Sequence, residues 1–481
     1  MCQSKSELYL QFKLAGQSQV FRFWDALTPD HQKKLLQELS TIDLSALSRW
    51  GRNAGSTNKA SKLDINDLAP PSVILHPSRG GDIAEWQKAK IVGQDTLRQG
   101  KVGVITVAGG SASRMGQKMV KGMLPITPLK KKSLFQVFAE KILGAQQNYG
   151  VTIPWLIMTS PGNHSAIVAF LEEHHYFGLN KAEVFCFPQG QLPAVDSQGK
   201  LLLEKEYALA LSPNGHGGVF EALQAQEILT KIAAKGIEIC SYFQIDNPLL
   251  YCLDPAFIGF HVARSSEFSS KMVRKYRSEE KIGLFCLNKA KLCVVEYSNA
   301  PKSLLNLREA DGSLTYSSGN IAAHLLSTSF LQRIVQPDHL ASLPVHCAHK
   351  KIYALDEDGK QQIAVKGTKF EHFIFDALPM AYHPIIVEAI REEEFSPIKN
   401  FEGVDSLESC KAHQQLRWNK WLEASGNSVR RDHEGFPLCQ IEISPAFADA
   451  ADIFLERYPS LQRPLPLDGK IYIGEKGLSS V

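Results

Sequence analysis

The central part of the chain alternates short apolar runs with stretches in which apolar residues recur at helical spacing. The apolar runs, which are typical of buried strands, lie at Val102–Val107, Trp155–Met158, Val184–Phe187 and Cys240–Ile245. The helical patterns between them lie at Ser133–Gln147, His164–His174 and Val219–Ala234. This alternation predicts an α/β fold with a doubly wound, mostly parallel, Rossmann-like sheet. Such sheets bind ligands at the carboxyl ends of their strands.

The two ends of the chain have different patterns. Near the N-terminus, apolar residues at helical spacing predict a helix over Asp30–Leu47, and a break rich in Gly, Ser and Asn follows at Gly51–Ser56. Beyond residue 400, an amphipathic stretch at Cys410–Glu423 precedes a short strand at Lys470–Gly474. We therefore expect a helical N-terminal region over residues 1–95, a central α/β domain over 96–400 and a small C-terminal α+β module over 401–481.

The composition is that of a soluble globular protein, with 44% hydrophobic and 21% charged residues. A net charge of only +3 gives no reason to expect nucleic acid or an acidic membrane as a partner. The N-terminus has no apolar signal core, and no apolar run approaches the roughly 20 residues of a membrane span. The nine cysteines form no C-x-x-C pair, which favours reduced thiols and a cytoplasmic location. We expect a monomer or a weak homo-oligomer.

A glycine-rich loop follows the predicted strand Val102–Val107. The sequence VAGGSASRMGQKMVKG (Val107–Gly122) places Gly109 and Gly110 after the strand, with Arg114 and Lys121 further along. Small residues expose backbone N–H groups that can cradle phosphate, and the two basic side chains add positive charge. The spacing fits neither a Walker loop nor a G-x-G-x-x-G turn. The loop predicts an anion site; the alternative is a tight turn with solvated basic residues.

Three other polar segments have both a functional and a structural interpretation. Asp246 and Asn247 end an apolar strand, where a carboxylate can hold Mg²⁺ against a nucleotide phosphate, or where the pair can simply form a turn. The loop SPNGHGG (Ser212–Gly218) could wrap a base or sugar, or could only begin a helix. The basic run Lys130–Lys132 is expected to be a solvated loop.

The same segments resemble the conserved blocks of the UDP-sugar pyrophosphorylases. Val107–Gly122 resembles their L-x-G-G-x-G-T-R-L-G-x-x-x-P-K-G signature, and FPQGQLPAVDSQGKLLLE (Phe187–Glu204) is similar to their F-x-Q-G-x-L-P-x-x-x-x-x-G-K block. Further matching blocks, in family order, are QIDNPLLYCLDPAFIGF (Gln244–Phe260), VVEYS (Val294–Ser298), GNIAAHLLSTSFL (Gly319–Leu331), GTKFEHFIFDAL (Gly367–Leu378) and REEEFSPIKN (Arg391–Asn400). The UDP-N-acetylhexosamine (UDP-N-acetylglucosamine) pyrophosphorylase branch matches best, and Glu442–Ser444 resembles its C-terminal domain.

The resemblance implies a nucleotidyltransferase that joins UTP to N-acetylglucosamine 1-phosphate and releases UDP-N-acetylglucosamine and pyrophosphate, with Mg²⁺ as cofactor. One alternative is a UDP-glucose or broad-specificity UDP-sugar pyrophosphorylase. An alternative of another class is a non-catalytic UDP-sugar sensor. A kinase or dehydrogenase is not favoured, because neither fingerprint is present.

The resemblance also implies roles for individual residues. The catalytic cations would be Arg114, Lys121 and Lys399; the nucleotide contacts would be Gly109, Gly110, Gln189, Gly215, His216 and Asp246, with Asp246 also binding the Mg²⁺. The sugar contacts would be Gly283, Glu296, Asn320, Phe373, Phe375 and Lys369, with the two phenylalanines walling the acetyl pocket and Lys369 reaching a phosphate. Without the family, the phenylalanines would be assigned to the core, the lysines to solvent and Glu296 to a strand edge.

Three positions depart from the family pattern. Ala112 replaces the third loop glycine, which would strain the backbone if that position needs positive φ. Val120 replaces the proline before Lys121. His216 stands where the hexosamine branch has asparagine, and the resulting G-H-G resembles the UDP-glucose enzymes. The last departure bears on sugar selectivity and not on the type of reaction.

Overall fold

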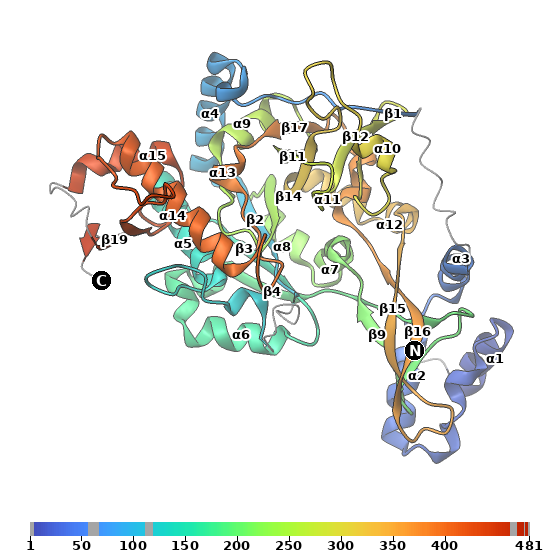
Figure 1. Cartoon of the computed structure of the whole chain (residues 1–481). Helices are drawn as coiled ribbons and strands as arrows, with labels where there is room; N and C mark the ends of the chain where they lie inside the picture. The colour runs from blue at the N-terminus through green and yellow to red at the C-terminus, as the bar shows by residue number, and fades with distance from the viewer. Residues whose placement is uncertain (1–3, 56–66, 111–118, 462–468, 476, 480–481) are drawn as a thin grey trace. The chain divides into compact units, whose positions relative to one another are not determined.

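The computed structural model describes residues 4–55, 67–110, 119–461, 469–475 and 477–479 (Figure 1). The chain divides into two compact units. Unit 1 comprises Met1–Asp67, Gln189–Glu221 and Pro337–Asp376. Unit 2 comprises Leu68–Pro188, Ala222–Gln336 and Ala377–Val481. The three-part division expected from the sequence groups the chain differently and stays a prediction.

Unit 2 is built on a ten-stranded sheet with the order β1-β12-β14-β10-β2-β3-β4 along its main path. Its four parallel neighbours are β10 (Ile239–Gln244), β2 (Val102–Val107), β3 (Trp155–Thr159) and β4 (Val184–Pro188). The remaining strands are β1 (Leu68–Ala69), β11 (Phe268–Arg274), β12 (Leu284–Asn288), β13 (Lys291–Val295), β14 (Ser318–Ser327) and β17 (Ile385–Glu388). The pairing of β10 with β14 is antiparallel, so one half of the sheet is mixed. The mostly parallel central sheet predicted from the sequence is confirmed.

Helices join and cover the parallel strands of unit 2. They include α4 (Ile83–Arg98), α5 (Leu134–Tyr149), α6 (His164–Glu173), α8 (Ile228–Ala234), α9 (Pro255–Ala263) and α11 (Thr328–Ile334). Helix α5 begins at an N-cap, Ser133, whose hydroxyl accepts a hydrogen bond from Gln136 N. Its Phe138 ring stacks on Phe243 of β10 at 4.5 Å between centroids. Glycine lets α4 and α9 approach closely, because a Cβ at Gly259 would collide with the backbone of Ala89.

The C-terminal part of unit 2 has a small core of its own. Strands β18 (Gln440–Ile443), β19 (Lys470–Gly474) and β20 (Gly477–Ser479) form a three-stranded sheet, and α14 (Leu407–Ala424) and α15 (Ala451–Arg457) accompany it. Its buried side chains include Trp421, Leu422, Ile441, Phe454 and Ile473.

Unit 1 combines N-terminal helices with a long hairpin. The helices are α1 (Lys5–Leu14), α2 (Pro29–Ser40) and α3 (Leu44–Gly55), and the hairpin strands are β15 (His346–Leu355) and β16 (Gln362–Glu371). Strand β6 (Val195–Asp196) pairs with β16 as the third strand. A shared core includes Phe12, Leu35, Leu39, Val195 and Phe370. The N-terminal helices therefore fold with segments that lie far away in sequence.

Two of the predicted helices are each divided in two, and one predicted loop is partly buried. The pattern over Asp30–Leu47 spans α2 and the start of α3, and the pattern over Val219–Ala234 spans α7 (Val219–Ala225) and α8. The prediction of a solvated loop at Lys130–Lys132 is wrong for Lys132, whose side chain is 5% exposed and pairs with Glu140 at 2.6 Å. Its ammonium also donates to the Tyr472 hydroxyl at 2.9 Å.

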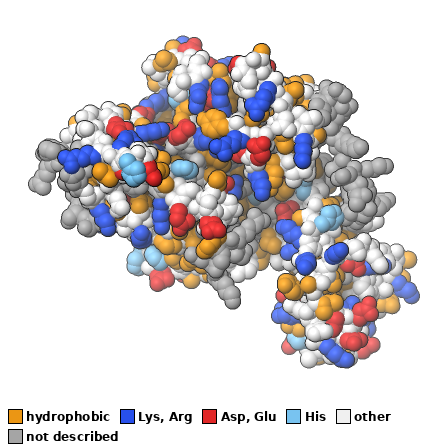
Figure 2. Space-filling model, viewed as in Figure 1, with side chains coloured by type: hydrophobic (Ala, Val, Ile, Leu, Met, Phe, Trp, Pro, Cys, Tyr) orange, Lys and Arg blue, Asp and Glu red, His pale blue; other side chains and the backbone are white. Residues whose placement is uncertain are grey.

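The cysteines in the described ranges are all free thiols. Burial raises the pKa of Cys240, Cys252 and Cys410 to about 12, which keeps these thiols protonated and unreactive. Among the residues that the structure describes, no helix has the length and apolar character needed to cross a bilayer. Figure 2 shows basic and acidic side chains interspersed over the visible face, as the small net charge leads one to expect.

Candidate active site

In unit 2, the glycine-rich loop and the end of β10 bring a lysine and an aspartate together. Lys121 Nζ lies 3.2 Å from Asp246 Oδ2, and the two side chains are only 18% and 14% exposed. The backbone N–H of Lys121 donates to Gly110 O, and the Asn163 side-chain amide donates to Gly109 O. An ammonium and a carboxylate, from segments that follow the adjacent parallel strands β2 and β10, therefore lie together at this edge of the sheet.

Two of the loop positions singled out in the sequence, Ala112 and Arg114, lie outside the described residues. Val120, which replaces the family's proline, lies within them and is buried. Its backbone has φ −70° and ψ 132°. This φ falls in the range that a proline ring would impose, so valine reproduces the proline conformation next to Lys121.

The segment that carries Lys399 is hydrogen-bonded to the segment that carries Asp246. Ile398 N donates to Asp246 O at 2.9 Å, and Ser396 N donates to Asn247 Oδ1 at 2.9 Å. The Asn247 side chain thus anchors the segment before Lys399, a long-range contact that neither interpretation of its sequence position included. Because Ile398 is bonded to the Asp246 backbone, the half-buried Lys399 is the next residue along the chain from that contact.

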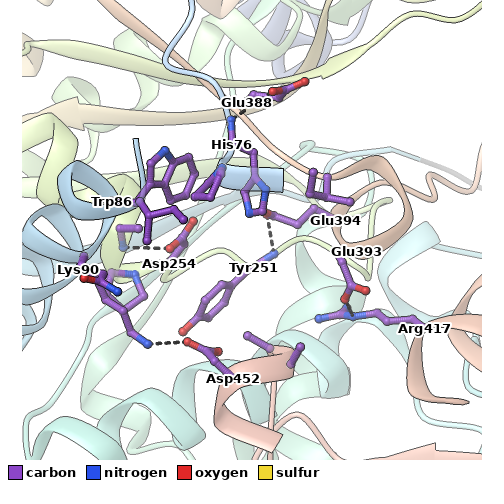
Figure 3. A pocket seen from close by; sticks show the side chains of 18 residues that line it. His76, Trp86, Lys90, Tyr251, Asp254, Glu388, Glu393, Glu394, Arg417 and Asp452 are labelled. Atoms are coloured by element: carbon purple, nitrogen blue, oxygen red, sulfur yellow. Dashed lines mark hydrogen bonds and ion pairs between the residues drawn. The ribbon is translucent and has the colours of Figure 1, made fainter. Parts of the chain in front are cut away.

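Unit 2 also has a buried ion-pair cluster, and its members Tyr251, Asp254 and Glu394 are drawn in Figure 3. The Glu394 carboxylate accepts from Tyr251 N at 3.2 Å and from Lys271 Nζ at 2.5 Å. Lys271, whose side chain is 2% exposed, also pairs with Asp254 at 2.9 Å. The cluster borders a cavity of about 450 Å³. None of the residues assigned to substrate or metal lines that cavity, and its carboxylates already have cationic partners, Lys271 for Asp254 and Glu394 and Arg417 for Glu393.

The three residues predicted to contact the hexosamine in unit 2 lie together. Gly283 precedes β12 and Glu296 follows β13, so the β12–β13 hairpin brings them side by side. Glu296 Oε1 lies 3.0 Å from the position that a Cβ on Gly283 would occupy. Asn320 N donates to Gly283 O at 2.8 Å, which places Asn320 on the neighbouring strand β14. This cluster offers a carboxylate and an amide beside a backbone with no side chain, which suits sugar hydroxyl and amide groups.

The donor set at Asp246 fits Mg²⁺ held mainly through nucleotide phosphates. In the described part of the chain, no three histidine, cysteine or acidic side chains gather closely enough to hold a metal ion by themselves. Mg²⁺ in nucleotide enzymes is bound by one or two carboxylates together with phosphate oxygens and water. A single carboxylate at a strand end, with a lysine beside it, is compatible with that mode and not with a protein-only metal cage.

In unit 1, the residues predicted to contact uracil meet at one loop. The Gln189 side-chain amide faces Gly215 O at 3.5 Å, and Gln189 is buried. Gly215 has φ 84°, and a Cβ there would collide with the His372 backbone, so only glycine fits. Asn214, to which no role was assigned from the sequence, anchors this loop: its side-chain amide donates to Glu221 at 2.8 Å, and its backbone carbonyl accepts from His372 N at 2.8 Å.

His216, Phe373, Phe375 and His346 form an aromatic cluster in unit 1. The ring of Phe373 stacks with that of His216, with 5.1 Å between centroids and an interplanar angle of 8°. It also stacks on His346 at 4.1 Å and contacts Phe375 at 5.2 Å. His216 Nδ1 accepts a hydrogen bond from Ile374 N at 3.2 Å. The cluster joins the SPNGHGG loop to the segment that follows β16.

Lys369 and His346 are the two remaining polar residues to place in unit 1. Lys369 lies on β16, half-buried, opposite Ala348 of β15. His346, at the start of β15, pairs with Asp376 at 2.8 Å. Neither His346 nor Asp376 was singled out in the sequence, because no motif spacing connects them.

The surroundings of the half-buried His216 predict acid sensitivity. Burial, and to a smaller extent the neighbouring His346, lowers the pKa of His216 to about 4, below the roughly 6.5 expected in the unfolded chain. Between these pH values the unfolded chain binds the extra proton, so stability falls as the pH is lowered through this window. From pH 7 to pH 5 we expect His216 to account for a loss of about 1–2 kcal/mol. Urea titrations at both pH values should show a smaller loss for His216→Asn, and equal losses would contradict the assignment.

Comparisons with known proteins agree with the geometry. Residues 51–438 match the family model described as UTP–glucose-1-phosphate uridylyltransferase. The chain is 34% identical to the UDP-N-acetylglucosamine pyrophosphorylase of Saccharomyces cerevisiae, covering 86% of this chain and 91% of the yeast protein. It is 33% identical to the UDP-N-acetylhexosamine pyrophosphorylase-like protein 1 of Xenopus tropicalis, covering 90% and 89%.

A solved structure shows the same fold. The uridine diphosphate N-acetylglucosamine pyrophosphorylase of Trypanosoma brucei superimposes with a TM-score of 0.80 at 24% identity, covering 97% of this chain and 98% of that protein. The family resemblance predicted from the conserved blocks is therefore confirmed over most of the chain. The chain belongs to the UTP–glucose-1-phosphate uridylyltransferase family.

Proposed function

We propose that this protein is a uridylyltransferase that forms UDP-N-acetylglucosamine and pyrophosphate from UTP and N-acetylglucosamine 1-phosphate. The observation that carries the proposal is the Lys121–Asp246 pair at the carboxyl end of the parallel strands, in a chain of this family. A non-catalytic sensor would not need a fixed, mostly buried ammonium at the phosphate loop. Similarity to proteins named UDP-N-acetylglucosamine pyrophosphorylase and UDP-N-acetylglucosamine diphosphorylase supports the N-acetylated sugar, and not glucose, as the substrate that we propose.

The reaction is a single in-line displacement at the α-phosphorus of UTP. An oxygen of the sugar 1-phosphate forms the new P–O bond, and the bond to the departing pyrophosphate breaks. The attacking phosphate is already ionised at neutral pH, so no protein nucleophile or base is required. The protein has to hold two anions that repel each other and to offset the charge that grows on the leaving group.

Residues of unit 2 have the charges for this task. Lys121 would hold phosphate oxygens near Asp246, and Lys399 would add a second cation from the neighbouring segment. Arg114 is assigned the same role from the sequence alone. Mg²⁺ bound at Asp246 would supply charge neutralisation of the triphosphate. Gly283, Glu296 and Asn320 would receive the sugar.

Residues of unit 1 would recognise the base and the acetyl group. Gln189 would hydrogen-bond the uracil, and Gly215 would let the base approach the backbone. Phe373 and Phe375 would wall the acetyl group, and Lys369 would reach a phosphate. His216 stacks on the acetyl wall, and we propose that it is compatible with the N-acetylated sugar despite its resemblance to the UDP-glucose enzymes.

The test is pyrophosphate release from UTP and MgCl₂, with N-acetylglucosamine 1-phosphate and glucose 1-phosphate compared side by side. We expect a clear preference for the N-acetylated sugar and loss of activity when EDTA removes the divalent cation. A preference for glucose 1-phosphate would assign the chain to the UDP-glucose enzymes. Binding of UDP-sugars without turnover under any metal would establish the sensor. We also propose a cytoplasmic location and a monomer or weak homo-oligomer, which cell fractionation and light scattering would test.

A further inference from the structure

His346 and Asp376 are arranged to fix the position of one aromatic side chain. One carboxylate oxygen of Asp376, Oδ2, makes both contacts: it lies 2.8 Å from His346 Nε2 and accepts a hydrogen bond from Phe373 N at 3.2 Å. The His346 ring in turn lies flat against the Phe373 ring, with 4.1 Å between centroids and an interplanar angle of 22°. A single oxygen therefore holds the backbone of Phe373 and the ring on which its side chain stacks.

The two polar side chains are sheltered enough for this contact to orient them. Asp376 is 11% exposed and His346 is 29% exposed. His346 stands at the start of β15, and its register partner Glu371 ends β16, two residues before Phe373. The hairpin thus delivers His346 to the segment that carries Phe373. A hydrogen bond from an imidazole to a carboxylate fixes the ring plane better than packing alone.

We propose that His346 and Asp376 are positioning residues for sugar selectivity, acting through Phe373. The inference rests on the proposed function, in which Phe373 walls the acetyl pocket. Because an apolar wall discriminates only when it touches the acetyl group, a displaced Phe373 loses the advantage of the N-acetylated sugar. Displacement of Phe373 does not affect the protein groups that contact both glucose and N-acetylglucosamine. We therefore expect a change in sugar selectivity and not in turnover.

Substitutions at His346 separate this role from a merely structural one. His346→Leu removes both the ring and the hydrogen bond, and we expect the ratio of UDP-N-acetylglucosamine affinity to UDP-glucose affinity to fall roughly tenfold, within the range for one apolar contact. The ratio of kcat/KM for the two sugar phosphates should fall equally, mainly through KM of the N-acetylated sugar. His346→Phe restores a flat ring against Phe373 but not the hydrogen bond to Asp376, and should recover only part of the selectivity.

The matched control is His349→Leu. His349 lies on the same strand, is exposed, and has a hydroxyl partner, Thr368 Oγ1, at 3.0 Å. It has no contact with the aromatic cluster among the described interactions, so selectivity should stay within twofold of wild type. Thermal melting of each variant verifies that the fold is intact.

Calorimetric titration with UDP-N-acetylglucosamine and with UDP-glucose, beside the kinetic assay, distinguishes the possible failures. A folded His346→Leu variant that keeps the wild-type selectivity would overturn the inference alone. Equal loss of affinity for both UDP-sugars would also overturn it, since that result assigns His346 a general structural role. A wild-type protein without any preference for the N-acetylated sugar would overturn both this inference and the proposed substrate.

Discussion

Replacing Lys121 by alanine is expected to reduce kcat by about 10²–10³-fold while leaving the fold intact, because the ammonium would be lost from the point where charge grows on the leaving pyrophosphate. Lys121 Nζ lies 3.2 Å from Asp246 Oδ2, and no large part of either side chain reaches solvent. Water cannot replace the missing cation at such a sheltered place without reorganising. The loss should fall on kcat more than on KM for UTP, since the interaction strengthens in the transition state.

The control for this variant is Lys131→Ala. Lys131 lies ten residues further along, is exposed, and donates to Pro128 O at 2.8 Å. The Lys131→Ala substitution removes the same charge from the same stretch of chain, and the variant should keep the wild-type rate. Lys121→Arg should recover part of the activity, because a cation remains but its planar head differs from the ammonium. A wild-type rate in Lys121→Ala would show that Lys121 does not act in the reaction.

Most of the sheet could be predicted because its elements are defined locally. Strand β2 spans the predicted residues Val102–Val107, and α5 begins at the residue after Ser133, whose hydroxyl caps the helix. An apolar run and a capping residue act within a few positions of one another, so the sequence alone specifies them. The contacts between the motifs follow from the topology, since parallel strands place their carboxyl ends at one edge.

The helix breaks were only partly visible in the sequence. Between α2 and α3, Asp43 accepts hydrogen bonds from Ser45 N and Ala46 N, and this capping aspartate could have been recognised. Between α7 and α8, the chain turns at Glu227, which has φ 55°. Neither glycine nor proline marks that position, so nothing local predicted the turn. Tertiary packing overrides helical periodicity there.

The remaining misses depend on partners that are remote in sequence. The buried Lys132 pairs with Glu140 and also donates to Tyr472, which is 340 residues away along the chain. A run of three lysines predicts solvent exposure when no partner is known. His346 and Asp376 are 30 residues apart and belong to different elements, so no spacing rule joins them. The phosphate loop, in contrast, has a recognisable composition, because phosphate can approach the backbone N–H groups only where the residues are small.

The second large effect concerns stability. Lys141 is 1% exposed, and its ammonium contacts Asp449 Oδ1 at 2.5 Å and donates to Leu250 O at 2.6 Å. Burial lowers the pKa of Lys141 and raises that of Asp449, so each charge depends on the other to remain ionised inside the protein. Arg417 also lies close, 4.0 Å from the Asp449 carboxylate. The pair joins α5 to the C-terminal part of unit 2.

Lys141→Met is therefore expected to lower the free energy of unfolding by about 3–5 kcal/mol, because it leaves the Asp449 carboxylate buried without its main partner. The matched control is Lys90→Met: Lys90 pairs with Asp452 at 2.6 Å, but the side chains are 42% and 51% exposed. Breaking that pair should cost less than about 1 kcal/mol, because water solvates the abandoned carboxylate. Urea unfolding followed by tryptophan fluorescence measures both variants.

A double variant separates the destabilisation caused by an unpaired buried charge from the stabilisation that the ion pair provides. Lys141→Met with Asp449→Asn removes both charges, and we expect it to be more stable than Lys141→Met alone, since a neutral amide is cheaper to bury than a lone carboxylate. Equal stability of the single and double variants would contradict this account. Because Lys141 and Asp449 belong to one compact unit, the loss should appear as a shift of a single transition. An additional early transition in Lys141→Met would instead support the separate C-terminal module over residues 401–481 that the sequence predicted.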